Sequence, residues 1–427
     1  MSLSETDLTG ATIGPVVLGD GAPHGWLDGL VGRLAVPRLL DGLAAWRVGR
    51  LTVHLPDGTA HTFGHADAQP SVHLRVHSLA LFRKFALAGD LGAGEAYMDG
   101  DWSADDQPHL LELGLRNSDA LALDSRLSRL LNVPNDWLHR RRPNTRAGSR
   151  RNIRDHYDLS NAFFSLFLDQ TMTYSSAVFG DTDRSLAEAQ REKYRALARK
   201  IGLRPGQHVL EIGCGWGGFA ELAALEFGAR VTGITVSREQ HDYSRARLAR
   251  AGLSDRTEIL LCDYRDVGGT FDHVVSIEML EAVGREYWDS FFASCDRVLA
   301  RGGRVAVQVI TMPDYRFQKY AKHCDWIQKY IFPGGLLPSL TELGRAAGRV
   351  SALTVIGVDD IAPDYARTLA AWRSAFLRRL PEVRQLGFGD RFIRMWDYYL
   401  SACEAAFRVR MLGTMQITWA RAGEDLR

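Results

Sequence analysis

The chain has 427 residues, which is enough for two domains or for one large domain with a substantial core. Hydrophobic residues make up 46% of the chain and charged residues 24%, a balance that excludes a disordered tail and a membrane-embedded bundle. The 52 basic and 51 acidic residues leave a formal charge of +1. We therefore expect no nucleic-acid partner, and any anionic partner must contact a local basic patch.

The cysteines and the first residues of the chain favour a protein of the cytoplasm. Five cysteines are scattered along the chain without CxxC spacing or a neighbouring histidine cluster, so we expect free thiols, no metal site and a reducing cytoplasm. The opening run MSLSETDLTG has acids and no apolar core, and no uncharged apolar run approaches the roughly 18 residues of a membrane-spanning helix. If the protein acts on lipid, we expect a cytoplasmic protein that associates peripherally with the membrane.

The first third of the chain is predicted to form a small α+β domain, residues 1–137. Short alternating runs at 51–55 (LTVHL) and 72–76 (VHLRV) are bounded by Asp, Gly or Pro and predict strands, and 78–88 predicts a helix. Residues 138–154 follow as a linker with seven arginines and no acid, in which Pro143 and Gly148 disfavour a continuous helix. Two interpretations stay open for this segment: a solvated connection, or a patch that contacts lipid phosphates.

Residues 155–427 are predicted to form the catalytic domain. A helix over 184–201 precedes a buried-type strand at 208–212, and a second helix follows over 217–227. Further strands are predicted at 230–235, 258–261, 273–277 and 304–310. Strands that alternate with helices predict an α/β fold with a parallel, doubly wound sheet.

A glycine-rich turn follows the first of these strands. In VLEIGCGWGG, Gly213, Gly215 and Gly217 stand between strand and helix, where glycine allows a sharp turn and close approach to a ligand. No Lys-Ser/Thr pair follows as a phosphate loop requires, and the spacing is not the GxGxxG of a dinucleotide site. Glu211 supplies a carboxylate suited to a cationic amine. The pattern favours an S-adenosylmethionine site over a purely structural turn.

The next two strand ends carry further candidate ligands for a nucleoside. The strand at 230–235 ends without the carboxylate that usually binds a ribose, so Thr235 and Gln240 would take that role. The strand at 258–261 is followed by Asp263 and Tyr264, at the edge where groups around an adenine are expected. The alternative interpretation of Asp263 is an ordinary turn residue at the end of a strand.

Seven motifs, in order from residue 151 to the end of the chain, resemble those of the cyclopropane-fatty-acyl-phospholipid synthases and the related mycolic acid methyltransferases. They are HYDLSNAFFSLFLDQTMTYSSAVF, LEIGCGWGG, GITVSREQ, DYRDV, SIEMLEAVG, DWIQKYIFPGGLLPS and YYLSACEAAFRVR. The run GEAYMDGDW at 94–102 is similar to the amino-terminal domain of the longer, phospholipid-acting members. The resemblance thus covers nearly the whole chain.

The resemblance implies a Rossmann-like methyltransferase fold capped by helices that form an acyl tunnel. It implies a reaction on the cis double bond of a phospholipid-bound acyl chain, with an accessory, lipid-binding amino-terminal domain and homo-oligomerisation. The residues that it places around S-adenosylmethionine are Tyr157, Tyr174, Ser175, Gly213, Gly215, Thr235, Gln240 and Tyr264.

The resemblance also implies a bicarbonate ion that acts as the base. The positions that match its cage are Ser176, Glu281, Gln308, Ile310 and Tyr365. Relatives have YSCAYF where this chain has YSSAVF, a His at the Gln308 position and a His at the Ala282 position. Serine and glutamine still hydrogen-bond an anion, but the loss of the imidazole removes one positive charge. Glu281 is the main catalytic candidate, and its alternative is a carboxylate that only stabilises a helix N-terminus.

The product depends on how the proton leaves. An isolated alkene is a weak nucleophile, so methyl transfer develops carbocation character that an anion or an aromatic face would stabilise. Aromatics in 156–179 and 326–332 are candidates for this role, or simply core and tunnel wall. Direct ring closure gives a cyclopropane, whereas a prior hydride shift gives an exomethylene, which a separate downstream reductase would convert to a methyl branch.

The altered cage and the Ala/Arg/Gly-rich composition favour the methylene branch of the family, which makes 10-methylene or tuberculostearic-type stearate. Two other functions stay open from the sequence. One is a methyltransferase for a small amine, phenol or amino acid, and the other is a noncatalytic protein that binds lipid or cofactor.

Overall fold

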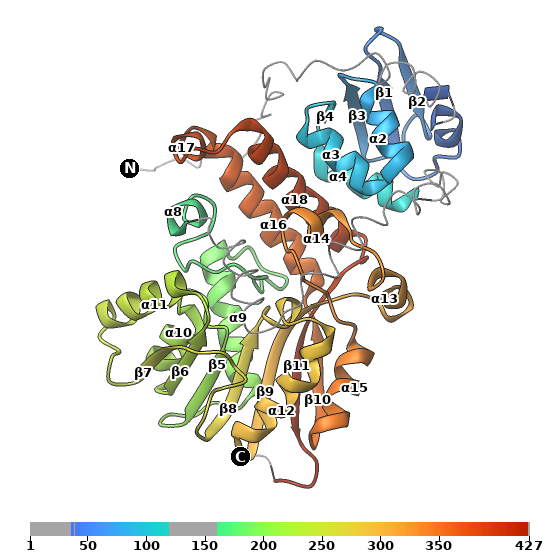
Figure 1. The fold of residues 1–427 in the computed structure, drawn as a ribbon. Coiled ribbons are helices and arrows are strands. Elements are labelled where there is room, and N and C mark those ends of the chain that lie inside the picture. The colour runs from blue at the N-terminus through green and yellow to red at the C-terminus, as the bar shows by residue number, and fades with distance from the viewer. Residues whose placement is uncertain (1–35, 38, 119–159, 426–427) are drawn as a thin grey trace, which may run out of the picture. The chain divides into compact units, whose positions relative to one another are not determined.

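A computed structural model describes residues 36–37, 39–118 and 160–425. Contacts divide the chain into two compact units, residues 1–123 and 124–427 (Figure 1). The predicted linker at 138–154 and the cofactor candidate Tyr157 lie outside the described residues. Within the described ranges, no helix is both long enough and apolar enough to cross a membrane.

The first unit is an α+β fold, as predicted. Its sheet has the order β2-β1-β3-β4, in which β1 pairs in parallel with β3 and antiparallel with β2. Leu51, Val53, Val72 and Val76 are buried, so the alternation in the sequence does mark the core face of these strands. The elements are β1 (Arg50–His54), β2 (Ala60–Phe63), β3 (Ser71–Val76), α2 (Ala80–Ala88), α3 (Asp90–Met98), β4 (Trp102–Ala104) and α4 (Gln107–Arg116).

The second unit is built on a seven-stranded sheet with the order β10-β11-β9-β8-β5-β6-β7. Its strands β5 to β9 run parallel, and the predicted strands all exist, two of them with the predicted bounds. The parallel strands are β5 (His208–Ile212), β6 (Arg230–Thr235), β7 (Thr257–Leu261), β8 (Phe271–Ile277) and β9 (Leu299–Thr311).

Two further strands at one side of the sheet were not predicted. β10 (Leu353–Asp360) and β11 (Gly413–Arg421) pair antiparallel with each other, and β11 pairs antiparallel with β9. The sheet is therefore mixed rather than wholly parallel. The sequence pattern did not reveal β11 because polar residues such as Gln416 and Thr418 are buried in it beside apolar ones.

Helices cover both faces of this sheet (Figure 1). Successive residues of the central strands point to opposite faces, so Val209 packs with α9 (Leu186–Lys200) and α10 (Gly218–Phe227), whereas Leu210 packs with α12 (Trp288–Val298) and α15 (Leu340–Val350). The same division separates Val275 from Val274 in β8. α11 (Arg238–Arg250) packs beside β6 and β7.

A helical cap lies beyond the carboxyl ends of the parallel strands (Figure 1). Its two long helices, α16 (Ala362–Arg378) and α18 (Asp390–Arg408), pack against each other. This arrangement agrees with the helical cap that the resemblance implied. The remaining elements are α8 (Asn161–Phe164), η1 (Leu280–Ala282), η2 (Arg285–Tyr287), α13 (Asp314–Tyr320), α14 (Trp326–Tyr330) and α17 (Leu380–Gln385).

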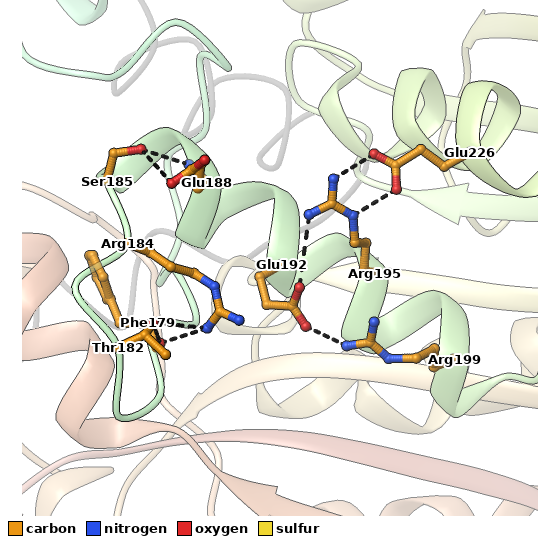
Figure 2. A network of polar contacts seen from close by, with 9 residues as sticks. All are labelled: Phe179, Thr182, Arg184, Ser185, Glu188, Glu192, Arg195, Arg199 and Glu226. Carbon is orange, nitrogen blue, oxygen red and sulfur yellow. Dashed lines mark hydrogen bonds and ion pairs between the residues drawn. The ribbon is translucent and has the colours of Figure 1, made fainter.

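Ion pairs and hydrogen bonds anchor the outer side of α9 (Figure 2). Arg195 donates to both carboxylate oxygens of Glu226 on α10, at 2.6 and 2.7 Å. Arg184, just before the helix, donates to the carbonyl of Phe179 at 2.8 Å, and Glu192 pairs with Arg199. Each exposed pair contributes little by itself, but together they connect α9 to α10 and to the segment before the helix.

Candidate active site

A pocket lies at the carboxyl edge of the sheet, where the chain leaves β5 for β6 on one side and later returns to β8 on the other. This reversal of strand order is where ligands bind in open α/β sheets. We call this cavity the edge pocket. It is lined by residues that follow β5, β6, β7 and β8, among them Glu211, Gly213, Gly215, Thr235, Gln240, Asp263, Tyr264 and Glu278.

The glycine turn is shaped as its sequence predicts. Gly213, Gly215 and Gly217 all have positive φ, at 83°, 51° and 81°. A Cβ on Gly213 would lie only 2.9 Å from Cγ of Met279, and one on Gly217 would lie 3.2 Å from Cβ of Ser244. Glycine is therefore required at Gly213 both for the backbone conformation and for the space beside the pocket.

Glu211 presents an unpaired oxygen in the edge pocket. Its side chain is buried, and Oε2 has no hydrogen-bond partner among the described residues. Burial raises the pKa of this carboxyl well above its ordinary value. A cationic amino group would pair with this carboxylate and restore its ionised form. The amino acid moiety of S-adenosylmethionine carries such a group, so the donor set fits this cofactor.

The other predicted cofactor ligands line the same pocket. Thr235 donates to Gln240 at 2.9 Å, which links the end of β6 to the first turn of α11. Asp263 accepts from the backbone and side chain of Arg265, so it is a turn residue and a pocket residue at once. The buried hydroxyl of Tyr264 has no partner within the described ranges. An adenosine in the pocket would have polar partners at each strand end.

The segment before α9 closes the pocket. The hydroxyl groups of Tyr174 and Tyr399 share a hydrogen bond of 2.8 Å. The hydroxyl of Ser175 accepts a hydrogen bond from Nζ of Lys193 at 2.5 Å. Lys193 is fully enclosed and also donates to Gln190 at 2.7 Å. Burial lowers the pKa of Lys193 to about 7, against the opposing pull of nearby carboxylates. We did not predict a role for this lysine from the sequence, although its four-residue spacing from Ala189 and Leu197 places it on the apolar side of the helix.

A second cavity, the apolar pocket, adjoins the edge pocket. Tyr174, Glu278 and Ala282 line both cavities. Aliphatic and aromatic side chains from β9, the segment around α14, and helices α16 and α18 make up most of the remaining wall. They include Ile310, Met312, Ile327, Phe332, Leu336, Leu337, Leu369, Phe407 and Leu412. An apolar chain would fit here with its reacting atoms beside the edge pocket.

Some of the aromatic residues form the hydrophobic core, and others line the pockets, where they could stabilise a cation. Phe163, Phe164 and Phe167 are buried in a cluster of rings that includes Trp396 of α18, so they are core. Tyr174 and Phe332 line the pockets instead, where an aromatic face can meet a developing cation.

Two carboxyl groups stand where the pockets meet. Glu278, the residue directly after β8, is held by the backbone N–H of Ser176 at 2.9 Å, Nε2 of Gln308 at 2.8 Å and the hydroxyl of Tyr365 at 2.8 Å. Glu281, one helical turn later, accepts from the backbone N–H of Ile310 at 2.5 Å. Burial and the neighbouring Glu278 raise the pKa of Glu281 to about 8.

The five positions expected to hold bicarbonate do come together, but around Glu278 and Glu281. Three of their donors already bind the Glu278 carboxylate, and the fourth binds Glu281. The hydroxyl of Ser176 donates to the carbonyl of Ala177 instead. Because these donors are already used by the two carboxyl groups, the residues do not form the free anion cage that the resemblance implies.

Two residues of this cluster, Glu278 and Gln416, were not predicted as site residues from the sequence. Glu278 lies in the quoted motif SIEMLEAVG and follows a parallel strand, which is the same signal that identified Asp263. Gln416 of β11 donates to Oε1 of Gln308 at 2.9 Å. This contact orients the side-chain amide of Gln308 so that its Nε2 donates to Glu278. No pattern in the sequence links Gln416 to the site.

Comparison with known proteins agrees with this geometry. Residues 144–417 match the model of the family described as mycolic acid cyclopropane synthetase. The chain is 42% identical over 388 residues to "Tuberculostearic acid methyltransferase UfaA1" of Mycobacterium tuberculosis, covering 88% of this chain and 90% of that protein. It is 35% identical over 364 residues to "Cyclopropane-fatty-acyl-phospholipid synthase" of Escherichia coli, covering 82% and 88%.

A solved structure gives the same result for the larger unit. The mycolic acid cyclopropane synthase CmaA1 complexed with SAH and CTAB superposes with a TM-score of 0.59 and 32% identity, covering 63% of this chain and 97% of that one. The expected methyltransferase fold is confirmed by this likeness and by the strand order. The chain belongs to the mycolic acid cyclopropane synthetase family, whose fold is that of S-adenosylmethionine-dependent methyltransferases.

Proposed function

We propose that the protein transfers a methyl group from S-adenosylmethionine to the cis double bond of an unsaturated fatty acyl chain carried by a phospholipid. The observation that carries this proposal is the meeting of the edge pocket with the apolar pocket at Tyr174, Glu278 and Ala282. A cofactor in the first pocket and an alkene in the second would meet at these residues. The printed names of the relatives, a tuberculostearic acid methyltransferase and a cyclopropane-fatty-acyl-phospholipid synthase, support this chemistry.

The residues of the edge pocket would bind and orient the cofactor. S-adenosylmethionine supplies an electrophilic methyl group on a cationic sulfur. Glu211 would pair with its amino group, Thr235 and Gln240 would hydrogen-bond the ribose, and Tyr264 would contact the adenine. The proposed role of each of these side chains rests on its place in the pocket.

The residues of the apolar pocket would exclude water and hold the acyl chain in line. An alkene reacts slowly with the methyl donor, so correct placement contributes much of the rate. Positive charge then develops on the acyl carbon, and the ring of Tyr174 and the carboxylate of Glu278, which line both pockets, would stabilise this charge.

The apolar lining disfavours the small-molecule methyltransferase considered from the sequence. A small amine or phenol would leave most of the wall formed by α14, α16 and α18 uncovered. We favour the exomethylene product, with a separate reductase downstream, and keep cyclopropane as the alternative product. Peripheral binding to a membrane, the lipid-binding role of the first unit and homo-oligomerisation remain predictions.

The test is a direct product analysis. Purified protein is incubated with S-adenosylmethionine carrying a labelled methyl group and with vesicles of oleoyl phospholipid, and the released fatty acids are analysed by mass spectrometry after derivatisation. We expect a gain of one CH2 as an exomethylene group. A ring would give the alternative product, and cofactor binding without any labelled lipid would contradict the proposed function.

A further inference from the structure

Glu278 occupies the junction of the two pockets and is the residue that faces both with a carboxylate. Its three hydrogen-bond donors come from parts of the chain that are far apart. Ser176 belongs to the segment before α9, Gln308 to β9 and Tyr365 to α16. The structure thus holds this carboxylate in one orientation at the place where an alkene would react.

The backbone at Glu278 is in a conformation that glycine prefers. Its φ is 49°, in the left-handed region, which is strained for a residue with a side chain. Such strain persists where the surrounding structure enforces it, and it is concentrated at functional sites. Two hydrogen bonds enforce it here, since the N–H of Glu278 donates to the carbonyl of Gln308 and the side chain of Gln308 holds the carboxylate.

The second carboxyl, Glu281, is not equivalent to Glu278. Its Oε2 has no partner among the described residues, and it accepts from a single backbone N–H. Two carboxyls this close do not both ionise readily. Burial raises the pKa of both, but Lys193, Gln308, Ser176 and Tyr365 counteract the rise at Glu278. Three hydrogen-bond donors favour the ionised form of Glu278, whereas burial with one donor favours the protonated form of Glu281, so the geometry assigns the negative charge of the pair to Glu278.

We infer that the carboxylate of Glu278 is the base that removes the proton after methyl transfer, so that the enzyme carries its own base and needs no dissolved bicarbonate. This inference rests on the proposed function. Methyl transfer leaves a positive charge on an acyl carbon. For the exomethylene product, a hydride first shifts with its electron pair from the methyl-bearing carbon to the neighbouring cationic carbon, which moves the positive charge next to the new methyl group. A C–H bond of that methyl group then breaks and its proton passes to an oxygen of Glu278. The electron pair of this bond forms the double bond after the hydride shift, or the ring bond to the cationic carbon without it. The acyl product is neutral, and the acid formed returns its proton to solvent between turnovers.

Three proteins test the inference in buffer freed of carbon dioxide and in the same buffer with added bicarbonate. They are the wild type, Glu278→Gln and the matched control Glu258→Gln, whose side chain is exposed on β7. Labelled methyl incorporation into oleoyl phospholipid gives kcat, and calorimetry with SAH reports the cofactor pocket. Since a positioned general base contributes roughly 100-fold or more, we expect kcat of Glu278→Gln to fall by that factor with SAH affinity retained. The wild type and the control should be equally active in both buffers.

A second variant separates loss of the base from loss of folding. Glu278→Gly relieves the left-handed backbone and opens a space between the three donors. We expect it to bind SAH, to be nearly inactive alone, and to recover at least about tenfold when bicarbonate or formate is added as an external carboxylate.

Two results would overturn the inference. One is a wild type that stops when bicarbonate is removed and recovers when it is restored. The other is a Glu278→Gln protein that keeps most of the wild-type kcat. A wild type that binds SAH but labels no lipid in either buffer instead contradicts the proposed function, and the two failures are thereby distinguished.

Discussion

Most of the edge pocket is formed at the carboxyl ends of β5, β6, β7 and β8, and each contributes residues within a few positions of the end of its strand, while the segment before α9 closes it. The apolar pocket is assembled from β9, α14, α16 and α18, and its walls are side chains far apart in the sequence. The first is shaped by backbone geometry and the second by packing between elements. The comparison indicates that cofactor binding and acyl binding can be impaired independently, which the following variants test.

The largest effect is expected at the glycine turn. Gly213→Ala places a Cβ 2.9 Å from Met279 at a φ of 83°, so the turn must move into the edge pocket. Strain of about 2 to 3 kcal/mol predicts a loss of SAH affinity of roughly 30- to 150-fold, measured by calorimetry. Gly252→Ala is the control, because Gly252 also has a positive φ but no atom lies within 4 Å of the position that its new methyl group would take. Equal affinity in both variants would contradict a backbone-shaped pocket.

The reciprocal change blocks the apolar pocket. Leu336→Trp adds bulk to the wall of that pocket at a side chain that is only partly buried. We expect kcat/KM for oleoyl phospholipid to fall about 20-fold, because overpacking by 1 to 3 kcal/mol opposes entry of the chain, while SAH affinity is retained. Leu386→Trp, at an exposed site after α17, should change neither quantity. A parallel loss of SAH affinity would show that the pockets are not independent.

A smaller effect is expected at Gln416, which we place as a positioning residue. Gln416→Leu removes the donor to Gln308, and an unsatisfied buried polar atom costs about 1 to 3 kcal/mol, so kcat should fall about tenfold with SAH affinity unchanged. Gln416→Glu keeps the shape but would attract the NH2 group of Gln308 away from Glu278. If orientation matters, the Glu variant has the lower kcat of the two among folded, SAH-binding molecules. A role in packing alone predicts the reverse order.

The smallest effect is a change in how stability depends on pH. The pKa of Glu281 is raised from 4.5 to about 8, so the folded protein binds more protons than the unfolded chain and its free energy of unfolding falls as pH rises through this window. Lys193, whose pKa is lowered from 10.5 to about 7, acts in the opposite sense and only above about pH 7.

Between about pH 5 and pH 7 Lys193 contributes little, but His208 and His273, whose pKa values burial lowers, and Glu211 and Glu278, whose pKa values burial raises, also contribute to the slope of urea unfolding against pH. The contribution of Glu281 is therefore taken from the difference between a variant and the wild type. Glu281→Gln should reduce the downward slope by up to about 1.4 kcal/mol per pH unit relative to the wild type. The exposed Glu258→Gln should keep the wild-type slope. Identical slopes for Glu281→Gln and the wild type would show that Glu281 is ionised throughout this range.

The residues of the edge pocket could be predicted from the sequence, whereas the contacts made by packing between distant elements could not. Glu211, Gly213, Thr235 and Asp263 lie beside the strands that present them, so strand periodicity and the rule that ligands bind at carboxyl ends locate them together. The bounds of β5 and β6 were predicted to the residue for the same reason, since each is a short apolar run between clear turn signals.

The role of Glu278 could not be predicted in this way. Its partners Ser176, Gln308 and Tyr365 are 102, 30 and 87 residues away, and nothing in the local pattern says that they converge. The resemblance pointed to Ser176, Gln308 and Tyr365, but it assigned them to an external anion. Only the packed structure shows that a side chain of the same protein already accepts their hydrogen bonds.

The antiparallel strand β11 also sets an order of events during synthesis. The edge pocket is encoded by residues up to Val283, whereas Gln416, which orients Gln308, is translated 108 residues after its partner. Domains generally begin to fold as they leave the ribosome, amino-terminal parts first. A nascent or prematurely terminated chain that lacks β11 would thus have the elements for cofactor binding without the support for Glu278. If Glu278 is the base, as we propose, such incomplete chains would bind the cofactor without modifying lipid.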